Sequence, residues 1–375
     1  MQSPSVLVVG GCGFMGYHIV DRLVQDPTIS TVAILSRSAS QSRNRLDGAT
    51  YFSGDLNNHE FIRDVIGEIK PIIIMHAASP SPVTGSPHEY QAVTVDGTKN
   101  LLKVATESPF VQVFIYTSSS TIAKGYEHLN LDENYPIANV DPKAPAYAKS
   151  KALAEAMVLE ADNPLSNKKK AEGWAGYLCT GALRFPIVYG THDLTSIPGC
   201  LNALKNGQTN VQLGDGKNLW DFCSTENAAV AHLLLAQNLM NGQDDKAVGK
   251  IHGEAFHIHD DEPRPFWEFA RKVWKYAGHE VDERNIRSIP VWLASSVAIF
   301  LELLFWVFTF GKKRPQTLGK QQVEYACFTH TYSLAKAKER LRYVPKQDFD
   351  GHLEQAVKWS LEHDGWAKRL KISTS

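Results

Sequence analysis

The sequence contains little that would indicate a metal centre, a disulfide framework or a nucleic-acid partner. Its cysteines are few, odd in number and without metal-ligand spacing, and they are Cys12, Cys179, Cys200, Cys223 and Cys327. The formal net charge is -1, so no overall positive field is available to attract nucleic acid. We therefore expect a protein of a reducing compartment that has no metal site and no nucleic-acid partner.

Two further patterns are missing. The chain reaches the apolar run Val6-Leu7-Val8-Val9 almost at once, so we expect no secretion signal, which needs a charged leader and a hydrophobic core. No period of about 20 to 50 residues recurs, which argues against a repeat protein. The 375 residues are 43% hydrophobic and 21% charged, which is enough for one large subunit or two unequal domains.

Apolar strands alternate with helical stretches in the first half of the chain, a pattern typical of a parallel sheet covered on both faces. The expected strands are 6–9, 31–35, 72–76, 113–117 and 181–184. The expected helices are 16–25, 61–69, 95–106 and 147–159, each long enough to cross over the sheet. We predict an α/β fold with a doubly wound parallel (Rossmann) sheet.

The alternation fades after Arg184, which predicts a smaller C-terminal substrate domain. Residues 1–190 are expected to form a dinucleotide-binding domain, to which 218–258 return through a helix at 226–240 and a strand at 255–258. Residues 191–217 and 259–375 are expected to form the substrate-binding region.

A glycine-rich segment follows the first expected strand and opens the first expected helix. Gly10, Gly13 and Gly16 would allow a tight turn, a close approach of a pyrophosphate and close helix packing. The anion would lie at the N-terminus of the helix, beside Phe14 and Met15. These five residues are our candidates for contacts with a dinucleotide.

The second expected strand ends in Ser36-Arg37, where an enzyme that uses NAD usually has an acidic residue. Arginine can pair with a 2′-phosphate that a carboxylate would repel, so we expect NADP to be preferred, with NAD possible. Alternatively, Arg37 stacks on the adenine or points to water. Asp55, followed by Leu56, could accept a hydrogen bond from the adenine amino group or could simply form a turn.

Tyr147 and Lys151 are spaced i, i+4 in an expected helix, so both side chains would share one face. The ammonium group would then favour the ionised phenol, which could exchange a proton with a substrate hydroxyl near neutral pH. Ser119 would orient that hydroxyl, with Ser118 as the alternative. A solvated helix face and a serine bonded to neighbouring backbone are the structural alternatives to these roles.

The order of these motifs resembles the extended short-chain dehydrogenases and, within them, the 3β-hydroxysteroid dehydrogenase family, over nearly the whole chain. The runs that carry the resemblance are His76-Ala77-Ala78-Ser79, Tyr116-Thr117-Ser118-Ser119, Tyr147 with Lys151, and Arg184-Phe185-Pro186-Ile187-Val188-Tyr189-Gly190. The resemblance implies that Ser119, Tyr147 and Lys151 are catalytic. It also implies cofactor contacts for Ala77, Ala78, Ser79, Pro186 and Val188.

A narrower similarity points to the decarboxylating sterol-4α-carboxylate 3-dehydrogenase group. It is carried by residues 214–218, 253–258, 261–263 and 265–269. This similarity implies oxidation of a 3β-hydroxyl on a sterol or terpenoid, here a 4-carboxylic acid whose β-keto acid product loses carbon dioxide. The residue that binds the carboxylate stays open among several polar candidates, which are Ser79, Ser81, His88, Tyr90 and His192.

The chain departs from its relatives at Ser36-Arg37, at Thr94 in place of asparagine, at Phe185 in place of proline and at Ser224 in place of an aromatic residue. These changes leave hydride chemistry intact and suggest a paralogue that acts on a related terpenoid. A 3β-hydroxysteroid dehydrogenase or ketone reductase without decarboxylation, a sugar-nucleotide epimerase or reductase, and a non-catalytic NADP sensor are the alternatives.

An apolar helix is expected at 289–310, with Glu302 as its only charge. Ser288, Ser295, Glu302 and Thr309 recur every seven residues and would form a narrow polar stripe, which favours a helix lying in or against a bilayer. Ser288 would cap the helix, Pro290 would stand in its first turn, and the basic cluster 311–314 would end it. A buried core helix or a homodimer interface is the alternative. The resemblance implies the cytosolic face of the endoplasmic reticulum membrane.

Overall fold

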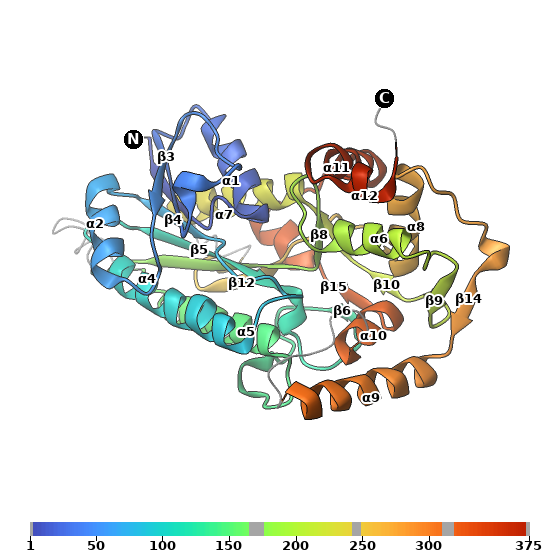
Figure 1. Ribbon diagram of the computed structural model, residues 1–375. Helices are drawn as coiled ribbons and strands as arrows, with labels where there is room; N and C mark the ends of the chain where they lie inside the picture. The colour runs from blue at the N-terminus through green and yellow to red at the C-terminus, as the bar shows by residue number, and fades with distance from the viewer. Residues whose placement is uncertain (1–2, 165–175, 242–248, 310–318, 373–375) are drawn as a thin grey trace.

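The computed structural model describes residues 3–164, 176–241, 249–309 and 319–372. Within them, seven strands form a wholly parallel sheet in the order β12-β7-β5-β4-β1-β2-β3 (Figure 1). Their bounds are β1 Ser5–Val9, β2 Thr31–Ser36, β3 Ala49–Ser53, β4 Ile73–His76, β5 Val113–Ser119, β7 Cys179–Phe185 and β12 Glu254–His257. The strand order reverses between β1 and β4, the point at which doubly wound sheets bind nucleotides. The predicted fold is therefore confirmed.

Helices cover both faces of this sheet, as Figure 1 shows. On one face lie α1 (Phe14–Val24) and α7 (Thr225–Asn241); on the other lie α2 (His59–Ile69), α4 (Gly97–Glu107) and α5 (Ala146–Glu160). A π-helical turn, Tyr90–Asp96, precedes α4 and follows the short α3 (Pro87–Glu89). The strands are apolar throughout because both faces of the sheet are buried. Each fully buried aliphatic side chain contributes about 1.5–3 kcal/mol to the stability of the fold.

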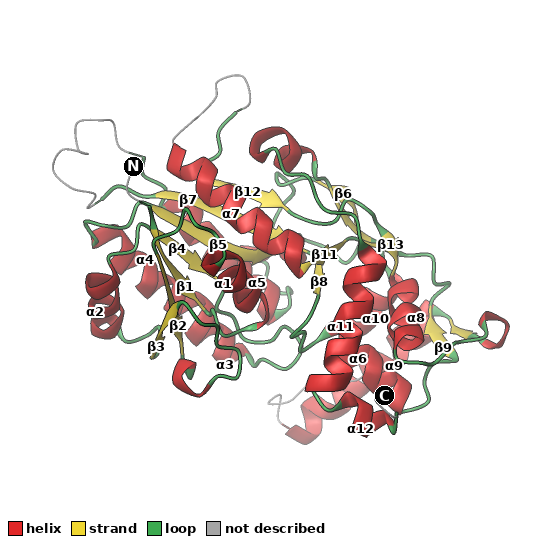
Figure 2. Ribbon diagram, turned by 90° about the horizontal axis from the view of Figure 1, so that it is seen from above, coloured by secondary structure: helices red, strands yellow, loops and turns green. Residues whose placement is uncertain are grey.

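The second part of the molecule joins segments that are far apart in the sequence (Figure 2). Its four-stranded sheet has the order β13-β10-β15-β6, with bounds Arg264–Pro265, Leu219–Trp220, His330–Tyr332 and His128–Leu131. Around it lie α6 (Ser196–Lys205), α8 (Phe266–Tyr276), α10 (Lys320–Cys327), α11 (Phe349–His363) and α12 (Trp366–Leu370). A separate strand pair joins β8 (Ile187–Tyr189) to β11 (Phe222–Ser224). The limits of the two domains stay a prediction.

The expected apolar helix is present as α9 (Val291–Thr309), but its start differs from the prediction. Ser288 and Ile289 belong to β14 (Arg287–Ile289), which pairs with β9 (Val211–Leu213). The Ser288 hydroxyl accepts a hydrogen bond from Gln212 Nε2 at 3.0 Å, so it does not cap α9. Pro290 precedes the helix, and its carbonyl accepts the first backbone hydrogen bonds, from Leu293 and Ala294. The expected cap by Ser288 was wrong, whereas Pro290 stands at the helix start, and the basic cluster 311–314 lies outside the described residues.

One face of α9 lies against α10, and the other is exposed along the lower edge of the molecule in Figure 1. Ala294 and Ala298 are buried against Val323, and Glu302 Oε1 accepts the backbone N–H of Lys320 at 2.8 Å. The exposed large apolar side chains are Trp292, Leu293, Val297, Ile299, Phe300, Leu303, Phe305, Trp306, Val307 and Phe308. The helix is long and apolar enough to cross a membrane, and most of its large side chains are exposed, so the buried-core alternative is wrong.

Candidate active site

A cavity of about 1110 Å³ opens at the carboxyl ends of the sheet strands and extends into the second part of the molecule. Single-ligand pockets usually measure about 300–1,000 Å³, so this volume has room for more than one small molecule. Every residue that the sequence assigned to catalysis or cofactor binding lines it, namely Gly10, Gly13, Phe14, Met15, Gly16, Ser36, Arg37, Asp55, Leu56, Ala77, Ala78, Ser79, Ser119, Tyr147, Lys151, Pro186 and Val188. The fold thus brings the whole set together, and their individual roles stay predictions.

The glycine loop has a shape that a side chain would destroy. Gly10 has a φ of 86°, and a Cβ there would lie 2.6 Å from the backbone nitrogen of Ala78. A Cβ on Gly16 would lie 2.1 Å from the Gly10 carbonyl oxygen, so α1 can approach the loop only through glycine. The first turn of α1 holds no acidic residue, and its backbone N–H groups are available to an anion. These residues fit the pyrophosphate of a dinucleotide.

The two polar residues at the end of β2, Ser36 and Arg37, have different surroundings. The Ser36 hydroxyl accepts a hydrogen bond from the backbone of Cys12 at 3.3 Å, which fastens the glycine loop to the strand. Arg37 is exposed at the cavity, and within the described part of the chain its guanidinium has no hydrogen-bonded or ion-paired partner. Asp55 accepts hydrogen bonds from the backbone and the side chain of Asn57, at 2.8 and 3.2 Å. Asp55 therefore forms a turn, which is the structural alternative to adenine binding, and it also lines the cavity.

Tyr147 lies in the first turn of α5, half-buried and with its ring edge-on to Tyr90 at 5.6 Å. Its pKa is raised, first by burial and then by the neighbouring phenols of Tyr325 and Tyr90, whereas a hydrogen bond with Ser119 opposes the shift. The expected lowering by Lys151 is not found, and the lysine Nζ donates instead to the Thr117 carbonyl at 2.8 Å.

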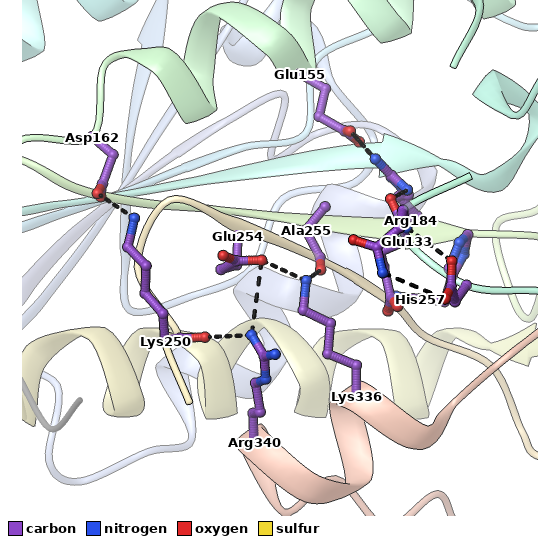
Figure 3. A network of polar contacts seen from close by, with 12 residues as sticks. Glu133, Glu155, Asp162, Arg184, Lys250, Glu254, Ala255, His257, Lys336 and Arg340 are labelled. Carbon is purple, nitrogen blue, oxygen red and sulfur yellow. Dashed lines mark hydrogen bonds and ion pairs between the residues drawn. The ribbon is translucent and has the colours of Figure 1, made fainter. Parts of the chain in front are cut away.

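Lys151 is almost fully buried, which lowers its pKa to about 7, while the carboxylate of Glu155 one turn later opposes this shift. Glu155 itself forms a forked ion pair with Arg184 of β7, as Figure 3 shows. Arg184 Nε lies 3.1 and 3.0 Å from the two carboxylate oxygens, and Arg184 Nη2 lies 2.6 Å from one of them. Arg184 Nη1 also donates to the Glu133 carbonyl at 3.1 Å. This pair fastens α5 to the sheet beside the candidate catalytic residues.

The two serines at the end of β5 differ in their surroundings. The Ser119 hydroxyl lies 2.9 Å from Thr121 Oγ1, and its proximity lowers the pKa of Tyr147. The Ser118 hydroxyl is buried and has no hydrogen-bond partner within the described residues. This geometry favours Ser119 over Ser118 as the group that orients a substrate hydroxyl.

Sequence reasoning missed the far wall of the cavity. That wall contains Phe266, Trp267, Phe269, Ala270 and Trp274 of α8, and Gln321, Gln322, Tyr325 and Ala326 of α10. The spacing of the apolar residues in α8 is helical, so this wall could have been found as an amphipathic helix. Of the open candidates for a carboxylate, Ser79 and Ser81 line the cavity, whereas His88, Tyr90 and His192 do not.

The sequence also matches known proteins of one family. The model of the 3-beta hydroxysteroid dehydrogenase/isomerase family matches residues 7–290. The chain belongs to this family. It is 35% identical to the decarboxylating sterol-4-alpha-carboxylate 3-dehydrogenase of Schizosaccharomyces pombe, over 96% of this chain and 98% of that protein. It is 30% identical to the enzyme of the same name from Homo sapiens, over 95% of this chain and 88% of that protein. The resemblance in the motifs is therefore confirmed.

Solved structures with the same fold include sugar-nucleotide enzymes. The UDP-glucose 4-epimerase of Thermotoga maritima matches with a TM-score of 0.66 and 18% identity, over 96% of this chain and 99% of that one. The dTDP-glucose 4,6-dehydratase of Bacillus anthracis, solved in complex with NAD, matches with a TM-score of 0.66 and 19% identity, over 98% and 99%. Identities this low show the fold alone. As a member of the 3β-hydroxysteroid dehydrogenase family, the chain is an NAD(P)-dependent oxidoreductase that acts on a CH–OH group, as expected.

Proposed function

We propose that this family member oxidises the 3β-hydroxyl of a sterol or terpenoid 4-carboxylic acid, after which the neighbouring carboxyl leaves as carbon dioxide. One observation carries this proposal: a single cavity joins the glycine loop, the Tyr147–Ser119 pair and an aromatic wall from α8. Flat, apolar side chains suit a fused-ring substrate, because its apolar surface leaves water when it binds. The printed names of the relatives support the same substrate class.

The residues divide the chemistry between them. Ser119 orients the hydroxyl oxygen, and the Tyr147 oxygen, once ionised, takes its proton as the carbonyl forms. NAD(P), when bound, accepts the hydride from the carbinol carbon. The product is a β-keto acid, in which the bond to the carboxyl carbon can break with its electron pair passing to the ketone oxygen. Protonation of the ring carbon then completes the reaction, and the Tyr147 and Ser119 hydroxyls can stabilise the enolate oxygen meanwhile.

Turnover with a 4-carboxy-3β-hydroxysterol tests this function. We expect reduced nicotinamide, carbon dioxide and the decarboxylated ketone to appear in equal amounts. Tyr147→Phe should stop all three and serves as the control that their appearance depends on catalysis. A stable ketone that retains its carboxyl, or faster oxidation of the matching neutral alcohol, would instead indicate a plain hydroxysteroid dehydrogenase.

We also propose that NADP is the preferred cofactor. The exposed Arg37 guanidinium lies at the cavity beside the hydroxyl groups of Ser38 and Ser42 and the amide of Gln41. These are suitable partners for a 2′-phosphate, since arginine binds such groups through two parallel hydrogen bonds.

Membrane attachment through α9 completes the proposal. Its exposed face is mostly apolar and uncharged, and it carries Trp292 and Trp306, a residue type that favours the membrane interface. We propose that this face lies in the cytosolic leaflet of the endoplasmic reticulum, from which an apolar substrate would reach the enzyme. A homodimer stays a prediction, which sedimentation of the detergent-solubilised protein would test.

A further inference from the structure

A chain of hydroxyl groups leads from the candidate catalytic tyrosine to α10. The Ser119 hydroxyl, which lowers the pKa of Tyr147 across the cavity, lies 2.9 Å from Thr121 Oγ1. Thr121 in turn lowers the pKa of Tyr325, which places the two hydroxyls close to each other. All four side chains line the same cavity, so a substrate that meets Tyr147 and Ser119 has Thr121 and Tyr325 beside it.

The hydroxyl of Tyr325 is held in a defined position. Its ring packs edge-on against Trp220 and His330, with centroids 5.2 and 5.7 Å away. The backbone of α10 is fixed as well, since Trp220 Nε1 donates to the Tyr325 carbonyl at 2.9 Å and Trp267 Nε1 to the Ala326 carbonyl at 3.1 Å. Such support is what an oriented binding group needs.

The Tyr325 hydroxyl accepts a hydrogen bond from the side of α10. Gln321 Nε2 donates to the Tyr325 oxygen at 2.9 Å, so that oxygen already acts as an acceptor on the helix side. Its own proton is left to point toward Thr121 and the cavity. Burial raises the pKa of Tyr325, while the hydrogen bond from Gln321 opposes the shift, so the phenol remains a donor at neutral pH.

The described cavity wall offers few positive charges to a substrate anion. Its cationic side chains are Arg37, at the end of β2, and Lys151, whose ammonium is bonded to the Thr117 carbonyl. The first lies at the predicted adenosine end, and the second is held by the Thr117 carbonyl. A carboxylate next to the reacting carbon must therefore find neutral donors.

We infer that the hydroxyls of Thr121 and Tyr325 form the subsite for the substrate's 4-carboxylate, an inference that rests on the proposed function. In such a substrate, a carboxylate oxygen and the 3-hydroxyl oxygen lie on the order of 3 Å apart, a hydrogen-bond length. The 2.9 Å between Ser119 Oγ and Thr121 Oγ1 matches this spacing. The hydroxyl of the substrate and its carboxylate would thus lie over neighbouring donors of one chain.

Neutral donors also suit the loss of carbon dioxide. Negative charge moves from the carboxylate to the ketone oxygen as the carbon–carbon bond breaks. A cation paired with the carboxylate would stabilise the state before this step, whereas only interactions that strengthen in the transition state speed it. Two hydroxyls would orient the carboxylate while stabilising its negative charge less than an arginine would.

The test compares two substrates that differ only in the 4-carboxyl group. Tyr325→Phe deletes one hydroxyl and keeps the ring, and Thr121→Val keeps the side-chain shape. We expect each variant to lower kcat/KM for the 4-carboxy sterol by about tenfold or more, because each loses a hydrogen bond to a charged group. The loss on the neutral sterol should stay below about threefold.

A binding measurement separates recognition from chemistry. In the inactive Tyr147→Phe background, Tyr325→Phe should weaken binding of the 4-carboxy sterol, followed by quenching of tryptophan fluorescence, since Trp220, Trp267 and Trp274 line the cavity. Binding of the neutral sterol should not change.

Tyr90→Phe is the matched control. Tyr90 also packs against Tyr147, but its hydroxyl donates to the Ser81 carbonyl at 2.7 Å and it does not line the cavity. The Tyr90→Phe variant should change kcat/KM by the same factor for both substrates. Equal losses on both substrates in Tyr325→Phe and Thr121→Val would overturn the subsite while leaving the proposed function standing. A wild-type enzyme that oxidises only the neutral sterol would overturn both.

Discussion

Glu155→Gln should both destabilise the protein and change its pH dependence. The carboxylate accepts three short contacts from Arg184, and the two side chains are only 1% and 7% exposed. Glutamine can offer one oxygen, turns an N–H donor toward the guanidinium and leaves a buried positive charge without its partner. Removing one member of a buried pair costs about 3–5 kcal/mol, and we expect the lower end because one acceptor remains.

The same substitution should move the activity profile. Glu155 raises the pKa of Lys151 against the larger lowering by burial, so the variant should have a still lower lysine pKa. Lys151 loses its charge as pH rises through that value. If the ammonium is the active form, the descending limb of kcat/KM moves to lower pH, whereas a purely structural role of Glu155 would leave the limb in place.

Urea unfolding in a fixed detergent, followed by tryptophan fluorescence, measures the stability change. Glu262→Gln is the matched control, since Glu262 pairs with Arg264 at 2.6 Å but is 46% exposed, and it should cost no more than about 1 kcal/mol. A loss in Glu155→Gln that equals this control would refute the reasoning that burial makes the Arg184 pair different.

Three further predictions concern catalysis, cofactor and membrane. Tyr147→Phe should lower turnover by about 10²-fold or more while leaving the cofactor dissociation constant unchanged, because it removes only the oxygen that moves the proton; near-normal turnover would contradict the assignment. Arg37→Ala should weaken NADP about tenfold or more and leave NAD unaffected, measured by titration, since a charged hydrogen bond is lost; equal losses would show that Arg37 does not bind the phosphate. Trp292→Gln with Trp306→Gln should lower partition onto anionic vesicles by about tenfold or more, because each buried aromatic side chain contributes about 1.5–3 kcal/mol; a wild-type protein that stays monodisperse without lipid or detergent would argue against membrane attachment.

The nucleotide-binding half could be predicted because its physics is local. Strands buried on both faces, such as Val113–Ser119, read as unbroken apolar runs, and crossover helices of eleven or more residues repeat with helical period. The second part could not be predicted in the same way. Strands such as Leu219–Trp220 and Arg264–Pro265 have two residues each, too few to show any period, and they pair with segments far along the chain.

The candidate site divides along the same line. Tyr147 and Lys151 are linked by one helical turn, so their spacing revealed them. Thr121 and Tyr325 line the same cavity although they are far apart in the sequence, and no sequence period connects them. The pKa of Tyr147 was expected to be lowered because spacing suggests a nearby ammonium. The pKa of Tyr147 is raised instead, first by burial, while Lys151 donates to the Thr117 carbonyl. Both features depend on tertiary packing, which the spacing does not reveal.

The apolar helix shows the same limit in its orientation. A seven-residue period put Ser295, Glu302 and Thr309 on one face, which the sequence could not assign to lipid head groups or to protein. The charge of Glu302 determines which way this face points, since a carboxylate on an apolar helix is stabilised where it accepts a hydrogen bond. Glu302 finds the backbone N–H of Lys320 at the start of α10, so this face turns inward. The opposite face is then left with exposed apolar side chains and no charge, which is the surface that a bilayer accepts most readily.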